Sequence, residues 1–426
     1  MNLTRTATLA ATAAVAALSV STLTVTPAHA DFDLVNTQAS VSEMRQNVID
    51  SMASRGAFGW QLAIAQNGQL KITDKRGTAV SEADNDGDRI AMLPTMRMEL
   101  ASVTKNITAV ATMKLLRRKG LTVESKIWPY LPASWDLGPG FTNLRFRHLL
   151  THTSGINQAV NAMPEDDRPP SNSWASMQII AENPAGVVPG SQRQYKNANF
   201  ALLRMINAVL WDQTGGAKYV TEIIEVENWK GVVIDTYEVQ TKVPVTAANH
   251  TSYTLDFMRK HIFEPAGLYG VGCITSANQG LVRSYKINAD QDDNGDIFTT
   301  SSGECAGARG IALSSVQLLQ YLAHLRHGTI INQADLDTMD DLRAGWNENS
   351  NGGDGGESGP ADGVADDSRS PGAYWHGGDL MDNSTGRELH TCAMTMDDGT
   401  EATLLVNSDM TGGPCGVLLQ AWFDAK

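Results

Sequence analysis

Strand-like segments stand at both ends of this chain, and helical patterns fill the region between them. Near the start, residues 60–77 (WQLAIAQNGQLKITDKRG) form two alternating runs around Asn67-Gly68, a dipeptide typical of tight hairpin turns. Near the end, HTCAMTM and ATLLVNS have the same character, and a helical pattern follows at 417–423. One shared sheet is the simplest way to bury the apolar residues of the strands from both chain ends. The sequence therefore predicts an α/β fold, with an antiparallel sheet formed by both chain ends and flanked by helices.

Helical spacing marks four further stretches: 41–54, 98–119 with Gly120 as its C-cap, 257–264 before Pro265, and 314–328. The pattern between roughly 116 and 269 is mostly helical, which predicts an inserted helical region. The α/β part would then comprise roughly 31–115 and 270–426. A segment near 217–250 alternates like a β-hairpin and is expected to be an extra insertion.

Residues 1–30 have the features of an export signal. Arg5 precedes a stretch rich in Ala, Leu and Val that ends in Ala28-His29-Ala30, and small residues at 28 and 30 suit a cleavage site. Ser, Thr and Pro27 interrupt the stretch, which argues against a retained membrane anchor, and no later stretch approaches the ~20 apolar residues of a membrane helix. We expect a signal peptide, 1–30, and a single secreted or periplasmic unit, 31–426, with no stable membrane anchor after cleavage.

Export makes the four cysteines, Cys273, Cys305, Cys392 and Cys415, candidates for two disulfides. Of three possible pairings we favour neighbours in sequence, Cys273–Cys305 and Cys392–Cys415, because they close short loops; free buried thiols are the alternative. No CxxC or nearby His pair occurs, so no metal site is expected. With 47 acidic and 33 basic residues the net charge is -14. A chain of this charge is repelled by phosphate backbones, so no nucleic-acid partner is expected.

Three acidic segments that contain glycine predict surface loops. Residues 82–88 and 349–367 have compositions that cannot build a core. Residues 290–297 copy the start of a calcium-binding loop, but Ser301 stands where the bidentate Glu belongs. A solvated turn is therefore favoured there over a calcium site.

Ser102-Val103-Thr104-Lys105 provides a candidate nucleophile and its base. Residues three apart lie on one helical face, so the Lys amine can reach the Ser hydroxyl. A Ser hydroxyl is a poor nucleophile until a base takes its proton, and burial near a helix N-terminus disfavours the charged form of a Lys. Taken alone, the motif also fits an ordinary helix start with a solvated Lys.

Two further short motifs carry suitable chemistry. Tyr195-Lys196-Asn197 offers a phenol that can relay a proton and an amide that can bind a carbonyl, although a buried core Tyr is the simpler interpretation. His376-Gly377-Gly378 precedes the terminal strands, and glycines let a backbone approach a ligand closely. An edge strand there would supply one N–H to an oxyanion, paired with the N–H of Ser102. An isolated His-Gly-Gly is more simply a turn.

The three motifs, in this order, resemble the serine β-lactamase-like, penicillin-recognising family on its class C side. Residues 148–155 (HLLTHTSG), 261–268 (HIFEPAGL) and 307–315 (GARGIALSS) are similar to other stretches of that family. The resemblance covers roughly residues 42–424. The family contains class C β-lactamases, D-alanyl-D-alanine carboxypeptidases, D-aminopeptidases and esterases. We interpret His148 and His152 as structural, because each can tie a loop to backbone groups.

The resemblance implies that Ser102 is acylated, that Lys105 accepts its proton, and that Tyr195 is the general acid/base for the leaving group or water. It implies no cofactor, a small-molecule or short peptide or ester substrate, and a chain expected to be a monomer. The expected site residues are catalytic Ser102, Lys105 and Tyr195; substrate-binding Asn197, His376, Gly377 and Gly378; and, through the backbone N–H groups of an oxyanion hole, Ser102 and Asp379.

The third motif departs from the Lys-Thr-Gly that class C β-lactamases usually carry. A Lys holds a substrate carboxylate as a fixed positive charge, whereas His376 would do so only when protonated. This departure favours a peptidase or esterase over a β-lactamase. The acidic segment 349–367 enters just before His376, and if it lines the cleft it would favour amine-bearing substrates over anionic ones.

The sequence therefore predicts a secreted serine hydrolase that cleaves D-residue-containing peptides or small esters through an acyl-enzyme on Ser102. One alternative is a β-lactamase of the class C type. Another is a catalytically silent penicillin-binding or sensor protein on the same scaffold. A Ser-His-Asp hydrolase is disfavoured, because the chain lacks a G-x-S-x-G elbow around Ser102.

Overall fold

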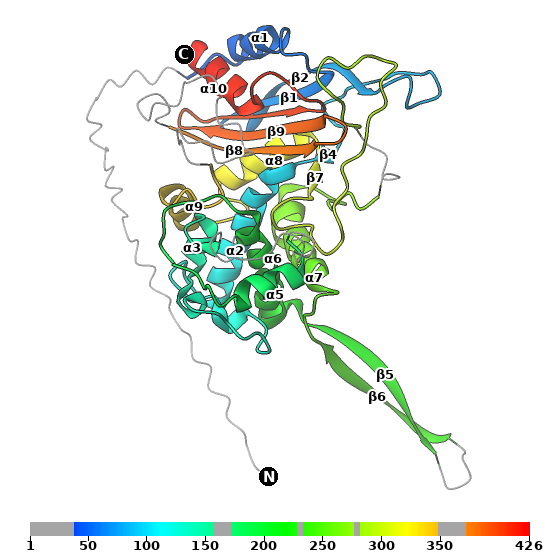
Figure 1. Ribbon diagram of the computed structural model, residues 1–426, viewed down its shortest axis with the longest axis vertical. Coiled ribbons are helices and arrows are strands. Elements are labelled where there is room, and N and C mark those ends of the chain that lie inside the picture. The colour runs from blue at the N-terminus through cyan, green and yellow to red at the C-terminus, as the bar shows by residue number, and fades with distance from the viewer. Residues whose placement is uncertain (1–37, 157–171, 228–232, 277–281, 348–371) are drawn as a thin grey trace, which may run out of the picture. The chain divides into compact units, whose positions relative to one another are not determined.

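A computed structural model describes residues 38–156, 172–227, 233–276, 282–347 and 372–426 (Figure 1). The predicted signal peptide, 1–30, and the acidic segment 349–367 lie outside the described residues. No helix within the described ranges is long and apolar enough to cross a membrane.

A six-stranded antiparallel sheet joins the two chain ends, with the strand order β3-β2-β1-β10-β9-β8. The central contact is between β1 and β10, where Trp60 lies opposite Val406. The sheet predicted from the sequence is therefore confirmed, and β8 lies at one of its edges. The strands of this sheet are β1 (Gly59–Gln66), β2 (Gln69–Val80), β3 (Ile90–Ala91), β8 (Ala373–Asp382), β9 (Arg387–Met396) and β10 (Thr400–Val406).

Helices cover both faces of the sheet (Figure 1). On one face, α1 (Val41–Met52) and α10 (Pro414–Asp424) pack on the larger side chains of β1, which include Trp60 and Leu62. On the other face, α8 (Ser315–Arg326) packs through Leu319 on the small side chains Ala63 and Ala65. Successive residues of a strand point to opposite faces, so β1 is buried on both sides.

The helix that carries Lys105 begins later than the sequence pattern predicts. Met98–Glu99 is a short strand, β4, paired with β7 (Ala312–Leu313), and Ala101–Val103 is a 3₁₀ turn. The helix α2 runs from Thr104 to Lys119 and ends at Gly120 in the predicted left-handed cap. A helix beginning at residue 98 is wrong because Ala101 has a φ of 48°, which a right-handed helix does not permit.

The middle of the chain is mostly helical, as expected. The pattern at 257–264 belongs to a longer unit, in which α7 (His250–Met258) is followed by a π turn, Arg259–Phe263, and a 3₁₀ turn, Glu264–Ala266, that includes Pro265. Residues 218–227 and 233–243 form two antiparallel strands that, within the described residues, pair only with each other. The remaining elements are 3₁₀ turns Trp128–Tyr130 and Phe141–Asn143, α3 (Phe146–Leu150), α5 (Trp174–Glu182), α6 (Asn197–Trp211), a π turn Asp212–Gly216, β5 (Lys218–Glu227), β6 (Val233–Val243), α7 (His250–Met258) and α9 (Gln333–Asp341).

The structure joins Cys273 to Cys305 and Cys392 to Cys415, the pairing that sequence proximity favours. The second bond links β9 to α10 on one face of the sheet. The two bonds use all four cysteines of the chain.

Two carboxylates of the acidic turn 290–297 pair with cations of the chain itself. Asp293 lies 2.7 Å from the amine of Lys286, and Asp296 pairs with Arg387. These ion pairs occupy oxygens that a calcium ion would need, so the geometry favours the solvated turn.

Candidate active site

Ser102, Lys105 and Tyr195 come together around one hydroxyl. The Lys105 amine (Nζ) lies 2.6 Å from Ser102 Oγ, and the Tyr195 phenol donates a hydrogen bond of 2.9 Å to the same oxygen. The Lys105 amine also lies 4.6 Å from the centre of the Tyr195 ring. Residues 93 positions apart in sequence thus surround the oxygen that the sequence singles out as a nucleophile.

The chain turns sharply just before the serine. Ala101, with its φ of 48°, separates β4 from α2 and sets Ser102 in the 3₁₀ turn that leads into the helix. Ser102 remains half-buried, whereas Lys105 is fully buried and donates a second hydrogen bond of 3.1 Å to the carbonyl of Ala308. A half-buried hydroxyl beside a fully buried amine suits a nucleophile and its base.

The ring of His152 packs against the ring of Tyr195, and the two ring centres lie 4.4 Å apart. The Nδ1 atom of His152 accepts a hydrogen bond of 3.2 Å from the backbone N–H of Lys196. Burial, reinforced by Arg193, Lys105 and His376, holds the pKa of His152 well below its usual value, so the ring is neutral. His152 therefore ties the Tyr195 segment in place, which agrees with its structural interpretation.

The edge strand β8 passes directly beside the serine. A Cβ atom added to Gly378 would lie 2.8 Å from the Ser102 nitrogen and 2.6 Å from both Leu100 O and Thr391 Oγ1, so only glycine fits at this position. The next residue, Asp379, carries the second amide expected in the oxyanion hole. At Gly377 the nearest atom to an added Cβ would be Cys415 Sγ, at an ordinary 3.6 Å.

The remaining predicted site residues are less closely engaged. His376 is 2% exposed, its Nδ1 lies 2.6 Å from the Gly377 carbonyl oxygen, and its ring centre is 6.5 Å from that of Tyr195. Asn197 is the first residue of α6 and is exposed. Neither residue is one of the two hydrogen-bond donors to Ser102 Oγ described above.

Comparison with known proteins places this arrangement in a known fold. Residues 44–224 match the family model for Beta-lactamase, a range that includes Ser102, Lys105 and Tyr195. A D-stereospecific amidohydrolase from Streptomyces sp. superimposes with a TM-score of 0.55 at 16% identity, over 91% of this chain and 99% of that one.

Two further solved structures are similar over most of their length. The D-amino acid amidase from Ochrobactrum anthropi gives a TM-score of 0.53 at 20% identity, over 90% and 98% of the two chains. A class C beta lactamase from Rhodobacter sphaeroides gives 0.55 at 16% identity, also over 90% and 98%. The chain has the β-lactamase-like fold. The resemblance to the β-lactamase-like, penicillin-recognising family is confirmed.

One buried acid next to this β-lactamase-like site was not singled out from the sequence. Glu99, in β4, is 1% exposed and accepts a hydrogen bond of 2.6 Å from the Gly310 N–H. Burial raises the pKa of Glu99 to about 7, although the charges of Arg309 and Lys105 lower it in part. A Glu that precedes the nucleophile by three residues is the only signal in the sequence, and it is a weak one.

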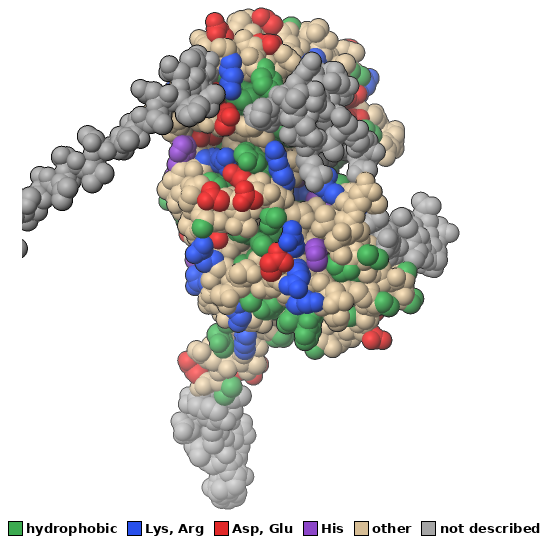
Figure 2. Space-filling model, turned by 90° about the vertical axis from the view of Figure 1, so that its left-hand side faces the viewer, with side chains coloured by type: hydrophobic (Ala, Val, Ile, Leu, Met, Phe, Trp, Pro, Cys, Tyr) green, Lys and Arg blue, Asp and Glu red, His purple; other side chains and the backbone are tan. Residues whose placement is uncertain are grey.

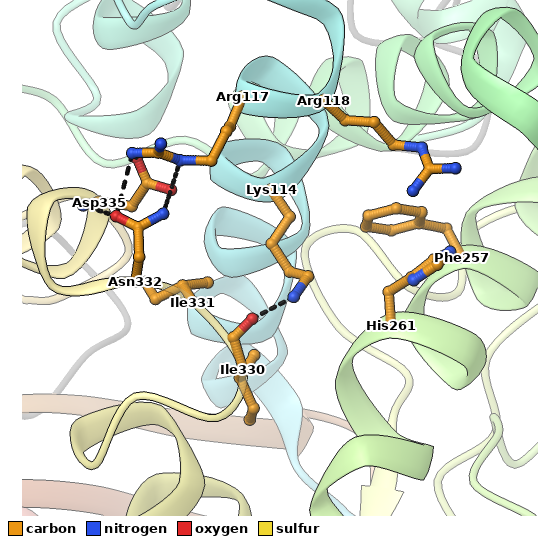
Figure 3. Close-up of a pocket in the computed structure, with 9 residues that line it drawn as sticks. All are labelled: Lys114, Arg117, Arg118, Phe257, His261, Ile330, Ile331, Asn332 and Asp335. Carbon is orange, nitrogen blue, oxygen red and sulfur yellow. Dashed lines mark hydrogen bonds and ion pairs between the residues drawn. The ribbon is translucent and has the colours of Figure 1, made fainter. Parts of the chain in front are cut away.

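A cavity of about 250 Å³ lies at the other end of α2 and contains none of the predicted site residues (Figure 3). Arg117 is turned to one side, where it pairs with Asp335, while Lys114 donates to the Ile330 carbonyl. On the face drawn in Figure 2, Lys and Arg side chains lie among Asp and Glu side chains, so neither charge forms a separate patch there. Because its cations are matched within the chain, this cavity is a weaker candidate for chemistry than the site around Ser102.

Proposed function

We propose that the chain is a secreted serine hydrolase that forms an acyl-enzyme on Ser102. The observation that carries the proposal is the convergence of the Lys105 amine and the Tyr195 phenol on Ser102 Oγ, at 2.6 and 2.9 Å. Both distances are within reach of proton transfer. We also infer that residues 31–426 form the exported catalytic unit, with the signal 1–30 removed.

In the acylation step, Ser102 Oγ attacks the substrate carbonyl and its proton passes to the neutral Lys105 amine. The developing oxyanion lies between the N–H groups of Ser102 and Asp379, since β8 runs beside the serine. When the carbon–nitrogen or carbon–oxygen bond breaks, Tyr195 protonates the leaving group and regains a proton from Lys105. In deacylation, a water molecule gives one proton to Tyr195 or Lys105 while its oxygen bonds to the acyl carbon. The bond from that carbon to Ser102 Oγ then breaks, and the proton passes to Ser102 Oγ.

We propose amides and esters of D-residues as the substrate class, with a free amine favoured over a carboxylate. His376 is buried against its own strand and does not present a fixed positive charge to a substrate carboxylate, as a Lys at the third motif would. Two of the structures with this fold are a D-stereospecific amidohydrolase and a D-amino acid amidase by name, which supports the same class.

The test is a panel of substrates scored by kcat/KM: D- and L-phenylalanine amide, a D-Ala-D-Ala peptide, nitrocefin and a p-nitrophenyl ester. We expect the D-amide to exceed its L-enantiomer and nitrocefin. A preference for nitrocefin would favour the class C β-lactamase alternative. Stoichiometric labelling by a fluorescent penicillin with no turnover of any substrate would favour the silent sensor.

Ser102→Ala should abolish both turnover and labelling by a fluorophosphonate while the fold survives. Ser42→Ala, at an exposed serine of α1, is the matched control and should leave both unchanged. Turnover that persists in Ser102→Ala protein would end the assignment of the nucleophile.

A further inference from the structure

A second cluster of titratable side chains lies on the face of β8 opposite Ser102. Gly378 faces the serine, so its neighbour Asp379 points to the other face of the strand. There its carboxylate bonds to Nδ1 of His390, the residue directly across from it in β9. This is the face of the sheet that α10 covers, because Cys392, two residues further along β9, is bonded to that helix.

The cluster forms where two strands of the sheet separate. β10 ends at Val406, opposite His390, and Tyr285 then lies between the two chains, bridging Glu388 on one side and Ser408 on the other. The chain after β10 is held there by a hydrogen bond from the Asp409 N–H to the Tyr285 carbonyl. The side chains of Glu388, His390 and Asp409 consequently converge.

The three side chains have the spacing of metal ligands. His390 Nε2 lies 3.1 Å from Glu388 Oε2 and 3.9 Å from Asp409 Oδ1, and one ligand atom from each residue lies within 4.8 Å of the others. Around a tetrahedral zinc ion with bonds of about 2.1 Å, ligand atoms are separated by roughly 3.4 Å. The two measured separations bracket that value.

His390 is built into this cluster rather than lying on the surface. The residue is 8% exposed, and within the described structure its Nε2 is buried and makes no hydrogen bond, despite the close Glu388 oxygen. The hydrogen bond that Nδ1 donates to Asp379 leaves Nε2 as the nitrogen directed at the carboxylates of Glu388 and Asp409. A carboxylate that fixes a His in this way is the usual arrangement behind a zinc ligand.

The negative charge around His390 also favours a bound cation. Three carboxylates, those of Asp379, Glu388 and Asp409, surround one imidazole. A divalent ion at this position would neutralise most of this charge.

We propose that Glu388, His390 and Asp409 bind a divalent transition metal, with zinc(II) as the best match, and that Asp379 orients His390 for it. An imidazole nitrogen with carboxylate oxygens suits zinc, whereas calcium and magnesium prefer oxygen ligands alone. Asp409, with 34% of its side chain exposed, marks the side from which the ion enters. The ion would tie β9 to the chain after β10, and its fourth ligand would be water.

The test is a titration of chelator-treated, tag-free full-length protein with zinc(II), and with cobalt(II) as a spectroscopic probe. We expect one equivalent to bind, visible cobalt absorption and a rise in Tm. His390→Gln should weaken the affinity at least 100-fold, and Asp379→Asn about 10- to 100-fold. His327→Gln is the matched control, because His327 contacts a carboxylate, Glu401, at 2.9 Å outside the cluster; its affinity should be unchanged.

Several results would overturn the proposal: no stoichiometric binding, an affinity that His390→Gln leaves unaltered, or a preference for calcium over zinc. If His390→Gln fails to fold, Asp409→Asn at the more exposed position decides, and it must weaken binding at least tenfold. None of these readouts requires turnover, so a failure here is distinct from a failure of the proposed hydrolase.

Discussion

The close passage of β8 beside the nucleophile makes Gly378→Ala the sharpest test of the site. An added Cβ would lie 2.6 Å from Leu100 O and from Thr391 Oγ1, and 2.8 Å from the Ser102 nitrogen. Ordinary van der Waals contact begins at 3.4 Å, so the strand or the turn must move by about 0.8 Å. Two of these atoms are backbone and cannot move aside as a flexible side chain would.

The displaced atoms are those that would bind the oxyanion. The Ser102 N–H is one donor, and the other, on Asp379, is the next residue along the moved strand. A misplacement of about 1 Å typically costs about 100-fold in rate, which corresponds to about 2.7 kcal/mol of transition-state stabilisation. We therefore expect Gly378→Ala to lower kcat/KM by about two orders of magnitude and to slow fluorophosphonate labelling.

Gly377→Ala is the matched control on the same strand: the sequence grouped Gly377 with the substrate-binding residues, but a Cβ there points to Cys415 of α10 and not to Ser102. Its Cβ would meet nothing closer than Cys415 Sγ at 3.6 Å, so we expect kcat/KM within about threefold of the parent. Both variants would be compared by circular dichroism and Tm to establish that they fold. If Gly378→Ala kept more than a fifth of the activity, or if the two variants lost activity equally, the oxyanion-hole assignment to β8 would be refuted.

Two further predictions concern the buried groups beside Ser102. Lys105→Met, which keeps the volume and removes the amine, should lower the acylation rate by about 10²- to 10⁴-fold, measured by fluorophosphonate labelling; a near-normal rate would move the base role to Tyr195. Glu99, with its pKa raised to about 7, holds its proton more tightly in the folded than in the unfolded state, so its contribution to stability is present below about pH 4.5 and is lost as the pH rises through 7. Glu99→Gln removes that loss. Between pH 4.5 and 7.5 the free energy of unfolding of the variant, measured in urea, should therefore rise relative to that of the parent by up to about 3 kcal/mol. If the free energies of unfolding of the two proteins changed in parallel with pH, the assignment of Glu99 as a buried acid would be contradicted.

Local patterns in the sequence predicted the sheet and the contact between Ser102 and Lys105, whereas the resemblance to a known family was needed to expect Tyr195 beside them. Asn67-Gly68 between alternating runs predicts a hairpin, and the structure places both residues at positive φ between β1 and β2. The three-residue spacing of Ser102 and Lys105 predicts their contact even though the helix starts only at Thr104. A turn of 3₁₀ helix followed by α-helix keeps residues three apart close together, so the error in the helix boundary did not affect the prediction.

Contacts that depend on strand register could not be predicted in the same way. Thr391 donates to the Leu100 carbonyl and lies opposite Gly378, but nothing in the local sequence states which residue of β9 faces which residue of β8. The cluster around His390 was missed for the same reason. The Glu-x-His pattern places two ligands on one face of a strand, whereas the third, Asp409, arrives only because Tyr285 takes the place of β10.

The third motif of this chain, His376-Gly377-Gly378, differs from Lys-Thr-Gly at its first two positions and shares the third. The contacts around β8 show which of these positions packing constrains. The third position is glycine in both versions, and packing explains it, because any side chain at 378 would strike the Ser102 turn. The second position has no such constraint, since a Cβ at 377 meets only ordinary contacts, and so packing does not account for the glycine there. The first position holds a His that is 2% exposed. Position 376 lies on the face of β8 toward Ser102, whereas position 377 faces Cys415 of α10. Of the charge and the hydroxyl that Lys-Thr-Gly supplies, this strand would therefore place only the charge beside Ser102.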